Sequence, residues 1–221
     1  MVEEIIPIQK KVLNLFSKSP LKDIFYWTGG TLLSVIYLHH RQSRDLDFFS
    51  NQVFTYNQII GFVRSLKKRL KLTKIEEKKI FDRWEFFLQD KDELRIEFVF
   101  YDHPKLRLRK KWQGILVDSL NDIAANKVMA LFDRSDPKDL VDLYFILIKK
   151  NYKVKTLLKF AEKKFGVKLE EVAFWSECCK NLKDLGVISP LLIVKDKQKT
   201  IAKIKEYFTS RSADYLRKIL K

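Results

Sequence analysis

The sequence contains few of the residues that build disulfide frameworks or zinc sites. Its two cysteines, Cys178 and Cys179, are adjacent in a segment with helical spacing, where neighbouring side chains diverge and cannot easily bridge or chelate. The three histidines, His39, His40 and His103, do not have the spacing of a known zinc-ligand set. We therefore predict reduced structural thiols and neither a disulfide framework nor a zinc site.

Long apolar runs are also missing. No uninterrupted apolar run approaches the ~18 residues that a membrane-spanning helix needs. Glu3 and Glu4 lie where a secretory signal would carry basic residues before an apolar core. We therefore expect a cytoplasmic protein without a membrane partner. Internal repeats and low-complexity linkers are absent too, so we expect the parts of the chain to pack together.

Acidic residues are too few to balance the basic ones. The chain has 28 Asp and Glu against 44 Lys and Arg, which gives a formal net charge of +16. Such an excess favours a polyanionic partner, most naturally nucleic acid, over a small neutral substrate. The basic residues gather at 67–74, 105–111 and 195–221. A solvated lysine-rich surface explains any one cluster equally well, so the prediction depends on the excess over the whole chain.

The residues that are present predict a globular α/β chain. With 221 residues, 46% of them hydrophobic, the chain is long enough for a sizeable core. We predict an α/β (α+β) core over residues 1–118, in which helices flank a mixed sheet. A helical C-terminal region over residues 119–221 is expected to pack on it. Periodicity predicts strands at 25–28, 45–49, 72–80, 84–89, 94–101 and 114–117, and helices at 5–17, 32–39, 55–70, 119–133, from 137, 154–165, 169–182 and 200–219.

Two adjacent glycines introduce the most informative segment. Gly29 and Gly30 lie between the first predicted strand and the helix at 32–39. Glycine lets backbone amides approach a phosphate closely, and the N-terminus of the following helix adds positive potential. Thr31 is placed to cap that helix. Standing alone, such a pair is more often a tight connection between two elements.

Acidic residues in two predicted strands indicate a metal site. Asp45 and Asp47 project to the same side of their strand, because side chains alternate along a strand. Mg²⁺ commonly takes one or two carboxylates together with phosphate oxygens, so this pair suits nucleotide transfer. Glu97 lies on the polar face of a later strand and is the obvious third carboxylate. The order of glycine pair, helix and aspartate pair favours a functional site over a solvated strand edge.

These motifs resemble those of a known enzyme family. The run Gly29-Gly30-Thr31-Leu32-Leu33, followed by His40-Arg41-Gln42-Ser43-Arg44-Asp45-Leu46-Asp47-Phe48-Phe49, is similar to the signature of the AbiEii-type nucleotidyltransferases, a branch of the polymerase-beta-like superfamily. A second block at 122–131, with Arg134 and 138–144, resembles that family's later Lys-x-x-Ala-Leu, Arg and basic-Asp-x-x-Asp elements. Residues after 147 contain no motif of this kind.

The resemblance implies transfer of a nucleotide from an NTP, with Mg²⁺ or Mn²⁺, to a macromolecular acceptor. It also implies a toxin of a toxin–antitoxin or phage-defence pair with a cognate antitoxin as partner. Relatives modify the acceptor end of tRNA, so tRNA is the implied acceptor. The implied metal ligands are Asp45, Asp47 and Glu97. The implied nucleotide-binding residues are Gly29, Gly30, Thr31, Arg41 (or Arg44), Ser43 and Lys127, with Asp139 organising Lys127 or the substrate hydroxyl.

The sequence leaves the acceptor and the activity open. The same chemistry could act on a small molecule or on a protein hydroxyl. The fold could also belong to a catalytically silent RNA-binding protein. The superfamily often has an aspartate where this chain has Glu97, which could be a metal ligand, a proton acceptor or the partner of a lysine.

Other roles are open as well. His40 either serves the site or is a partly buried side chain that orients the loop before Asp45. Only the family resemblance favours a functional role for Lys127, because a lysine on a helix surface is usually just solvated. Asp139 and Asp142 share one helix face, where they could simply favour the helix dipole and pair with nearby cations.

Overall fold

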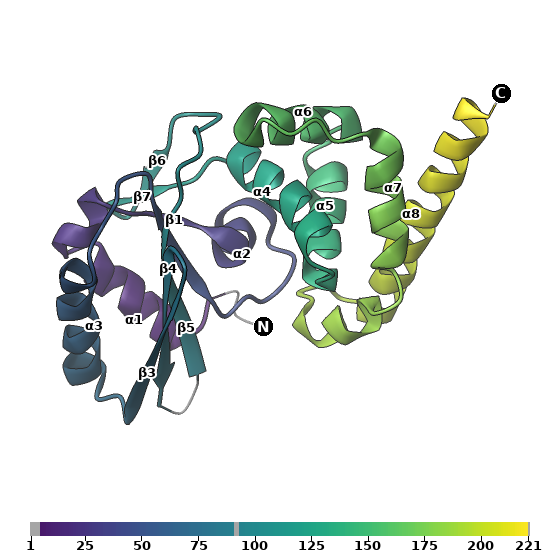
Figure 1. The fold of residues 1–221 in the computed structure, drawn as a ribbon. Coiled ribbons are helices and arrows are strands. Elements are labelled where there is room, and N and C mark those ends of the chain that lie inside the picture. Colours follow the sequence, from purple (N-terminus) through teal and green to yellow (C-terminus); the bar gives the residue numbers. More distant parts are fainter. Residues whose placement is uncertain (1–4, 91–92, 221) are drawn as a thin grey trace. The chain divides into compact units, whose positions relative to one another are not determined.

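The computed structural model describes residues 5–90 and 93–220 and shows two compact units (Figure 1). The first comprises the described residues up to Tyr37 together with Gln42–Ser119. The second comprises Leu38–Arg41 and the described residues from Leu120 onward. The expected packing of the helical part on the core stays a prediction. Glu3, Glu4 and Lys221, which entered the sequence predictions, lie outside the described residues.

The first unit contains a seven-stranded mixed sheet of order β3-β4-β5-β2-β1-β7-β6. Its strands are β1 Tyr26–Thr28, β2 Leu46–Ser50, β3 Lys74–Ile80, β4 Arg83–Gln89, β5 Glu93–Phe100, β6 Lys110–Trp112 and β7 Ile115–Val117. The pairs β2–β5 and β1–β7 are parallel, and the other neighbours are antiparallel. The predicted meander of β3, β4 and β5 is therefore confirmed, as is the mixed α/β fold.

Helices α1 (Pro7–Phe16) and α3 (Tyr56–Leu70) lie on one face of this sheet, and α2 lies on the other (Figure 1). Alternation along β2 and β5 turns Phe48 and Phe98 toward α1 and α3. The ring of Phe16 stacks on Phe48 with 3.9 Å between centroids, and Phe62 meets Phe98 edge-on at 6.5 Å. The same alternation turns the intervening charged residues of β2 and β5 to the opposite face.

The connection between β1 and β2 differs from its prediction. The helix expected at 32–39 begins earlier, as α2 (Gly29–Leu32), and continues as a π-helical segment over Leu33–Leu38. Its N-cap is Thr28, whereas the Thr31 hydroxyl donates to the main-chain oxygen of Asp45. The prediction that Thr31 caps this helix is wrong, because Thr31 lies inside the first turn and faces a neighbouring segment. π-Helical turns are rare in proteins as a whole, and those that occur are often found at functional sites.

The second unit is helical. Its elements are α4 Leu120–Asp133, α5 Pro137–Lys149, α6 Val154–Phe165, α7 Glu171–Lys180, a 3₁₀ segment at Leu185–Leu191 that was not predicted, and α8 Lys197–Ile219. Local sequence sets several ends. Pro137 begins α5, with the carboxylate of Asp136 accepting from the Lys138 amide at 2.9 Å, and Gly166 ends α6 at φ +71°. Helix α4 packs on α5 and α6, and α8 packs on α7.

Two predicted absences concern cysteines and membrane spans. Cys178 is buried in α7 and Cys179 is exposed, and both are free thiols. Burial raises the pKa of the Cys178 thiol well above its usual value, so this thiol is protonated and unreactive.

None of the helices within 5–90 and 93–220 combines the length and the apolar character that crossing a bilayer requires.

Candidate active site

A row of acidic residues crosses the sheet of the first unit. Asp47 on β2 is the register partner of Glu97 on β5, and Glu97 is the partner of Glu85 on β4. On the other side Asp47 is paired with Thr28 of β1. Register partners present their side chains on the same face, here the face opposite α1 and α3. The structure thus brings Asp47 and Glu97 together on neighbouring strands.

Arg95 joins the acidic row to Asp45. Its guanidinium lies 2.7 Å from Asp45 Oδ2 and 2.9 Å from Glu97 Oε1. Burial lowers the pKa of Arg95, but its hydrogen bond to Asp45 and the charge of Glu97 outweigh this and raise the pKa above its ordinary value. Arg95 is therefore a permanent cation between two of the candidate acids. Sequence reasoning missed this role, although charges at alternate positions 95 and 97 of one strand were a usable signal.

Glu97 has an unusual environment for a carboxyl group. It is 6% exposed, and burial raises its pKa above the ordinary value. The charges of Arg95 and Arg83 oppose this shift, while the neighbouring Glu85 adds to it. A carboxylate with a raised pKa is a better proton acceptor near neutral pH than an ordinary one.

Gly29 makes room for Asp47. Its φ is +82°, a conformation that side chains other than glycine rarely adopt, and a Cβ built there would lie 1.7 Å from Asp47 Oδ2. The backbone at the start of α2 therefore lies so close to the Asp47 carboxylate that no side chain fits at position 29. The expected use of Gly29 and Gly30 in holding a phosphate stays a prediction, but the close approach of a backbone segment to the acidic row is present.

We predict that Gly29→Ala destabilises the chain by ~1–3 kcal/mol, because the new methyl group combines a disfavoured φ with a clash at Asp47. Thermal unfolding would measure the loss. The matched control is Gly61→Ala on α3, where no atom lies within 4 Å of the new methyl group. That change should instead stabilise by ~0.5–1 kcal/mol, since it removes glycine from an exposed helix. Equal effects of the two substitutions would contradict the prediction.

The implied divalent ion can be tested against these donors. Strand β2 begins at Leu46, so Asp47 lies in it and Asp45 lies just before it, whereas the sequence predicted a strand over 45–49. Both offer hard carboxylate oxygens, which fits Mg²⁺ or Mn²⁺. Within the described part of the chain, no group of three or more His, Cys, Asp or Glu residues forms a metal site. The guanidinium of Arg95, rather than a third carboxylate, occupies the space between Asp45 and Glu97. The aspartates fit the ion, and the role of Glu97 as a ligand stays a prediction.

The second unit holds Lys127 in a buried ionic network. Its ammonium lies 2.7 Å from Asp139 Oδ1 and 2.8 Å from Asp142 Oδ2, and Lys127 is only 7% exposed. Arg134 also binds Asp139, with Nε 2.9 Å from Oδ2. Asp139 and Asp142 are neighbours on one face of α5, as their spacing predicted. The contact expected between Asp139 and Lys127 is present, and the reach of Lys127 to a triphosphate stays a prediction.

Asp142 is the centre of this network. Arg41 binds it with two nitrogens, Nε and Nη2, at 2.7 and 2.8 Å, and His40 Nε2 lies 2.7 Å from Oδ1. Both His40 and Arg41 are buried, His40 completely, and the choice between a functional role for His40 and a role in orienting the loop before Asp45 stays open. Burial lowers the pKa of His40, which keeps the ring neutral. Arg41 is thus committed to Asp142, while Arg44 is exposed. Ser43 holds Gln9 through its main-chain oxygen at 3.0 Å.

The network predicts a loss of stability in acid. Burial alone would raise the pKa of Asp142, but Arg41 and Lys127 outweigh it and hold this pKa well below the ordinary value of 3.8. A carboxylate whose folded-state pKa is depressed adds stability above its unfolded pKa and loses it as pH falls toward the folded value. The difference in melting temperature between wild type and Asp142→Asn should therefore narrow as pH falls below about 3.8. Melting curves of both proteins, recorded between about pH 2 and about pH 7 in steps of about one pH unit, check this. A difference in melting temperature that stays constant over this range would contradict the prediction.

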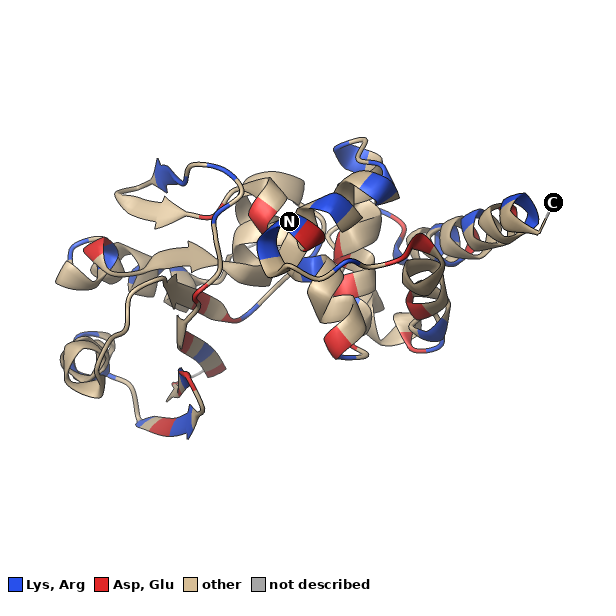
Figure 2. Cartoon of the chain, turned by 45° about the horizontal axis from the view of Figure 1, so that its top comes forward, with Lys and Arg blue, Asp and Glu red and all other residues tan. Residues whose placement is uncertain are grey.

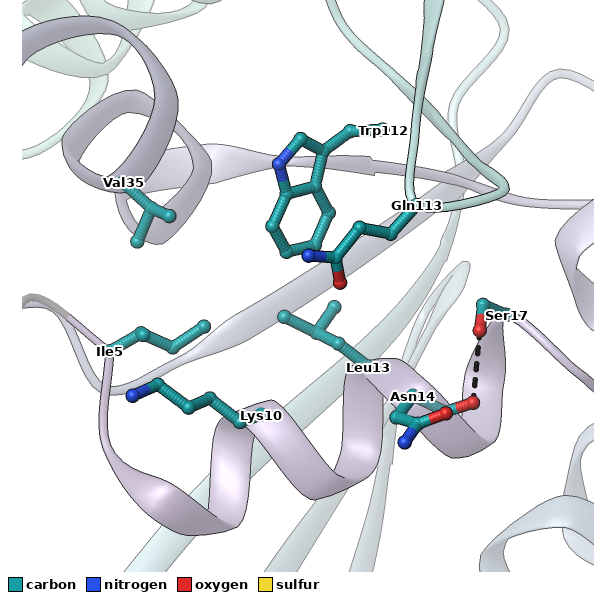
Figure 3. Close-up of a pocket in the computed structure, with 8 residues that line it drawn as sticks. All are labelled: Ile5, Lys10, Leu13, Asn14, Ser17, Val35, Trp112 and Gln113. Carbon is teal, nitrogen blue, oxygen red and sulfur yellow. Dashed lines mark hydrogen bonds between the residues drawn. The ribbon is translucent and has the colours of Figure 1, made fainter.

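The first unit contains a pocket of about 490 Å³ (Figure 3). Helix α1 supplies much of its wall, with Ile5 before it, Val35 from the π-helical segment, and Trp112 and Gln113 at the turn between β6 and β7. It contains none of the candidate acids.

Comparisons with known proteins identify the family of this chain. The family model described as "Nucleotidyl transferase AbiEii toxin, Type IV TA system" matches residues 11–215. An uncharacterized protein of Aquifex aeolicus (strain VF5) is 30% identical over 165 residues, which are 71% of this chain and 74% of that protein. Both blocks of sequence motifs fall inside residues 11–215, which the family model matches.

Two crystal structures from Helicobacter pylori share the fold. JHP933 superposes with a TM-score of 0.58 at 17% identity, covering 97% of this chain and 95% of that one. A protein assigned as a nucleotidyltransferase superposes with a TM-score of 0.59 at 19% identity, covering 96% and 94%. The family model spans nearly the whole chain. The chain therefore belongs to the AbiEii family of nucleotidyltransferase toxins of type IV toxin–antitoxin systems.

Proposed function

We propose that this nucleotidyltransferase moves a nucleotide from an NTP to a hydroxyl group of an RNA, with tRNA as the acceptor and Mg²⁺ or Mn²⁺ as the metal. The observation that carries the proposal is the close approach of Asp47 to Gly29 in the acidic row. This geometry offers carboxylate oxygens for an ion and backbone amides for phosphate at a single place. Both are needed to bind a triphosphate and its metal together.

The reaction divides among the residues of the first unit as follows. The acceptor oxygen forms a bond to the α-phosphorus while the bond from that phosphorus to the pyrophosphate oxygen breaks, and pyrophosphate leaves. Asp45 and Asp47 would hold the ion, which when bound supplies positive charge to the phosphate oxygens. Glu97 accepts the proton of the attacking hydroxyl, a role that its raised pKa favours over that of a third ligand.

Arg95 has a positioning role in this scheme. Its guanidinium bridges Asp45 and Glu97, so it fixes the separation of a metal-binding carboxylate from the proton acceptor. The pKa of Glu97 is held down by the charge of Arg95 against the effect of burial. Arg95 therefore limits how far burial raises the pKa of Glu97.

The acceptor is proposed from charge. The net charge of +16 attracts a polyanion, and Lys and Arg recur along α8 as far as the C-terminal end (Figure 2). A small-molecule acceptor needs none of this charge. Toxicity through tRNA modification and the action of a cognate antitoxin complete the proposal, and the family supports both a toxin and an antitoxin.

The test is to incubate the purified protein with Mg²⁺, each α-labelled NTP in turn, and total tRNA. We expect label on tRNA, absent with the double variant Asp45→Asn/Asp47→Asn and retained with the control Asp214→Asn on exposed α8. Label on the protein or on a lysate component instead of tRNA would overturn the proposed acceptor. No label anywhere, with RNA still bound, would overturn the transfer and support a silent RNA-binding protein.

A further inference from the structure

The turn between β3 and β4 exposes an aromatic ring that the fold does not use. Phe81 is 93% exposed and its backbone has φ +49°. This left-handed conformation is unfavourable for a bulky residue, and two-residue hairpin turns usually place glycine, asparagine or aspartate there. Phe81 therefore combines backbone strain with no burial of its ring. Such outliers concentrate at sites where the strained residue has a function.

Exposed cations precede Phe81 on β3. Lys78 and Lys79 are both exposed, and Lys78 lies on the face of the acidic row because Glu85 is its register partner. The ammonium of Lys79 instead lies 5.4 Å from the ring centroid of Trp84, on the face that Trp84 shares with Phe98. An exposed aromatic ring next to lysines suits a single-stranded nucleic acid, because bases stack on aromatic faces while lysines attract the backbone phosphates.

The sheet register relates this turn to the acidic row. Lys78 of β3 is the register partner of Glu85, which continues the row through Glu97 to Asp47. Three strand spacings of ~4.8 Å across the sheet and about three residues of ~3.3 Å along β3 separate Phe81 from Asp47 by roughly 15–20 Å. A small acceptor bound at Asp47 does not span that distance. A stacked strand, at ~3.4 Å per nucleotide, spans it with about five nucleotides.

We propose that Phe81 stacks on an unpaired base of the acceptor strand, several nucleotides away from the reacting hydroxyl. This inference rests on the proposed function and deepens it. The substrate class becomes an RNA whose reacting end is single-stranded over about five nucleotides, at the spacing of ~3.4 Å used above.

The binding test uses fluorescein-labelled oligouridylate of about 12 nucleotides, roughly twice the length of strand that spans the distance from Phe81 to Asp47. The same oligonucleotide paired with oligoadenylate provides the duplex. Anisotropy at constant salt gives Kd for each. Phe81→Ala should raise Kd for the single strand about 5- to 100-fold and leave the duplex unchanged, while Phe81→Trp retains binding. Val187→Ala, which also alters an exposed apolar side chain, is the matched control and should change neither value.

Phe81→Gly separates the binding role from the strain. Glycine accepts φ +49° without penalty, so this variant should melt a few degrees higher, roughly 2 °C, and yet bind the single strand as weakly as Phe81→Ala. Unchanged Kd for the single strand in Phe81→Ala and Phe81→Gly would overturn the inference. If wild type labels tRNA and Phe81→Ala does so with the same KM, the inference alone fails. If wild type labels no RNA, the proposed function fails, and the oligonucleotide measurement still decides the stacking.

Discussion

Asp47→Asn should reduce nucleotidyl transfer by at least ~10²–10³-fold while leaving the melting temperature unchanged or slightly raised. Asp47 lies beside Glu97 in the acidic row and against the backbone of Gly29. Removing its charge weakens binding of the divalent ion that the proposed mechanism needs. It also relieves repulsion between neighbouring carboxylates. Initial rates with labelled NTP and RNA, together with melting curves, provide the measurement.

The control for Asp47→Asn is Asp214→Asn, which neutralises an exposed aspartate paired with Arg217 on α8. Its rate should stay within about twofold of wild type, since an exposed ion pair of this kind contributes little. A useful further readout is the Mg²⁺ dependence, because a ligand variant should require more Mg²⁺ and a merely structural one should not. Full activity of Asp47→Asn would remove the acidic row from the mechanism.

Asp142→Asn should destabilise the protein by ~3–5 kcal/mol, the usual result of removing one member of a buried ion pair. The substitution leaves Arg41 and Lys127 buried without the carboxylate that both of them contact. For a chain of this size we expect the melting temperature to fall by roughly 6–20 °C. Calorimetry of the full chain at neutral pH gives the value, and Asp214→Asn again serves as the exposed control.

Replacing Arg41 as well distinguishes a charge effect from a packing effect. The double variant Arg41→Met/Asp142→Leu substitutes apolar side chains for a buried pair, and such replacements are often neutral or even stabilising. It should recover part of the stability that Asp142→Asn loses. If the single variant melts within about 2 °C of wild type, the network contributes little to stability.

Much of the chain follows from local sequence. The aspartate pair, the glycine pair and the helices with proline and glycine at their ends were predictable because caps, turns and periodicity act over a few residues. Pro137 and Gly166 mark helix ends where they were expected, and the alternation of β5 correctly turned Glu97 away from the core. The π-helical segment was not predicted, because the choice between α-helical and π-helical hydrogen bonding depends on the packing around a segment rather than on residue propensity.

The sequence by itself determined the fold class, the family motifs and the excess of positive charge, since each of these is written in residue type and short spacing. Tertiary structure decided which charges meet. Arg95 reaches Asp45, and Arg41 reaches Asp142, only because strand register and helix packing bring together residues that lie far apart along the chain. Pairing across such separations depends on the whole arrangement of strands and helices, and no local pattern specifies it.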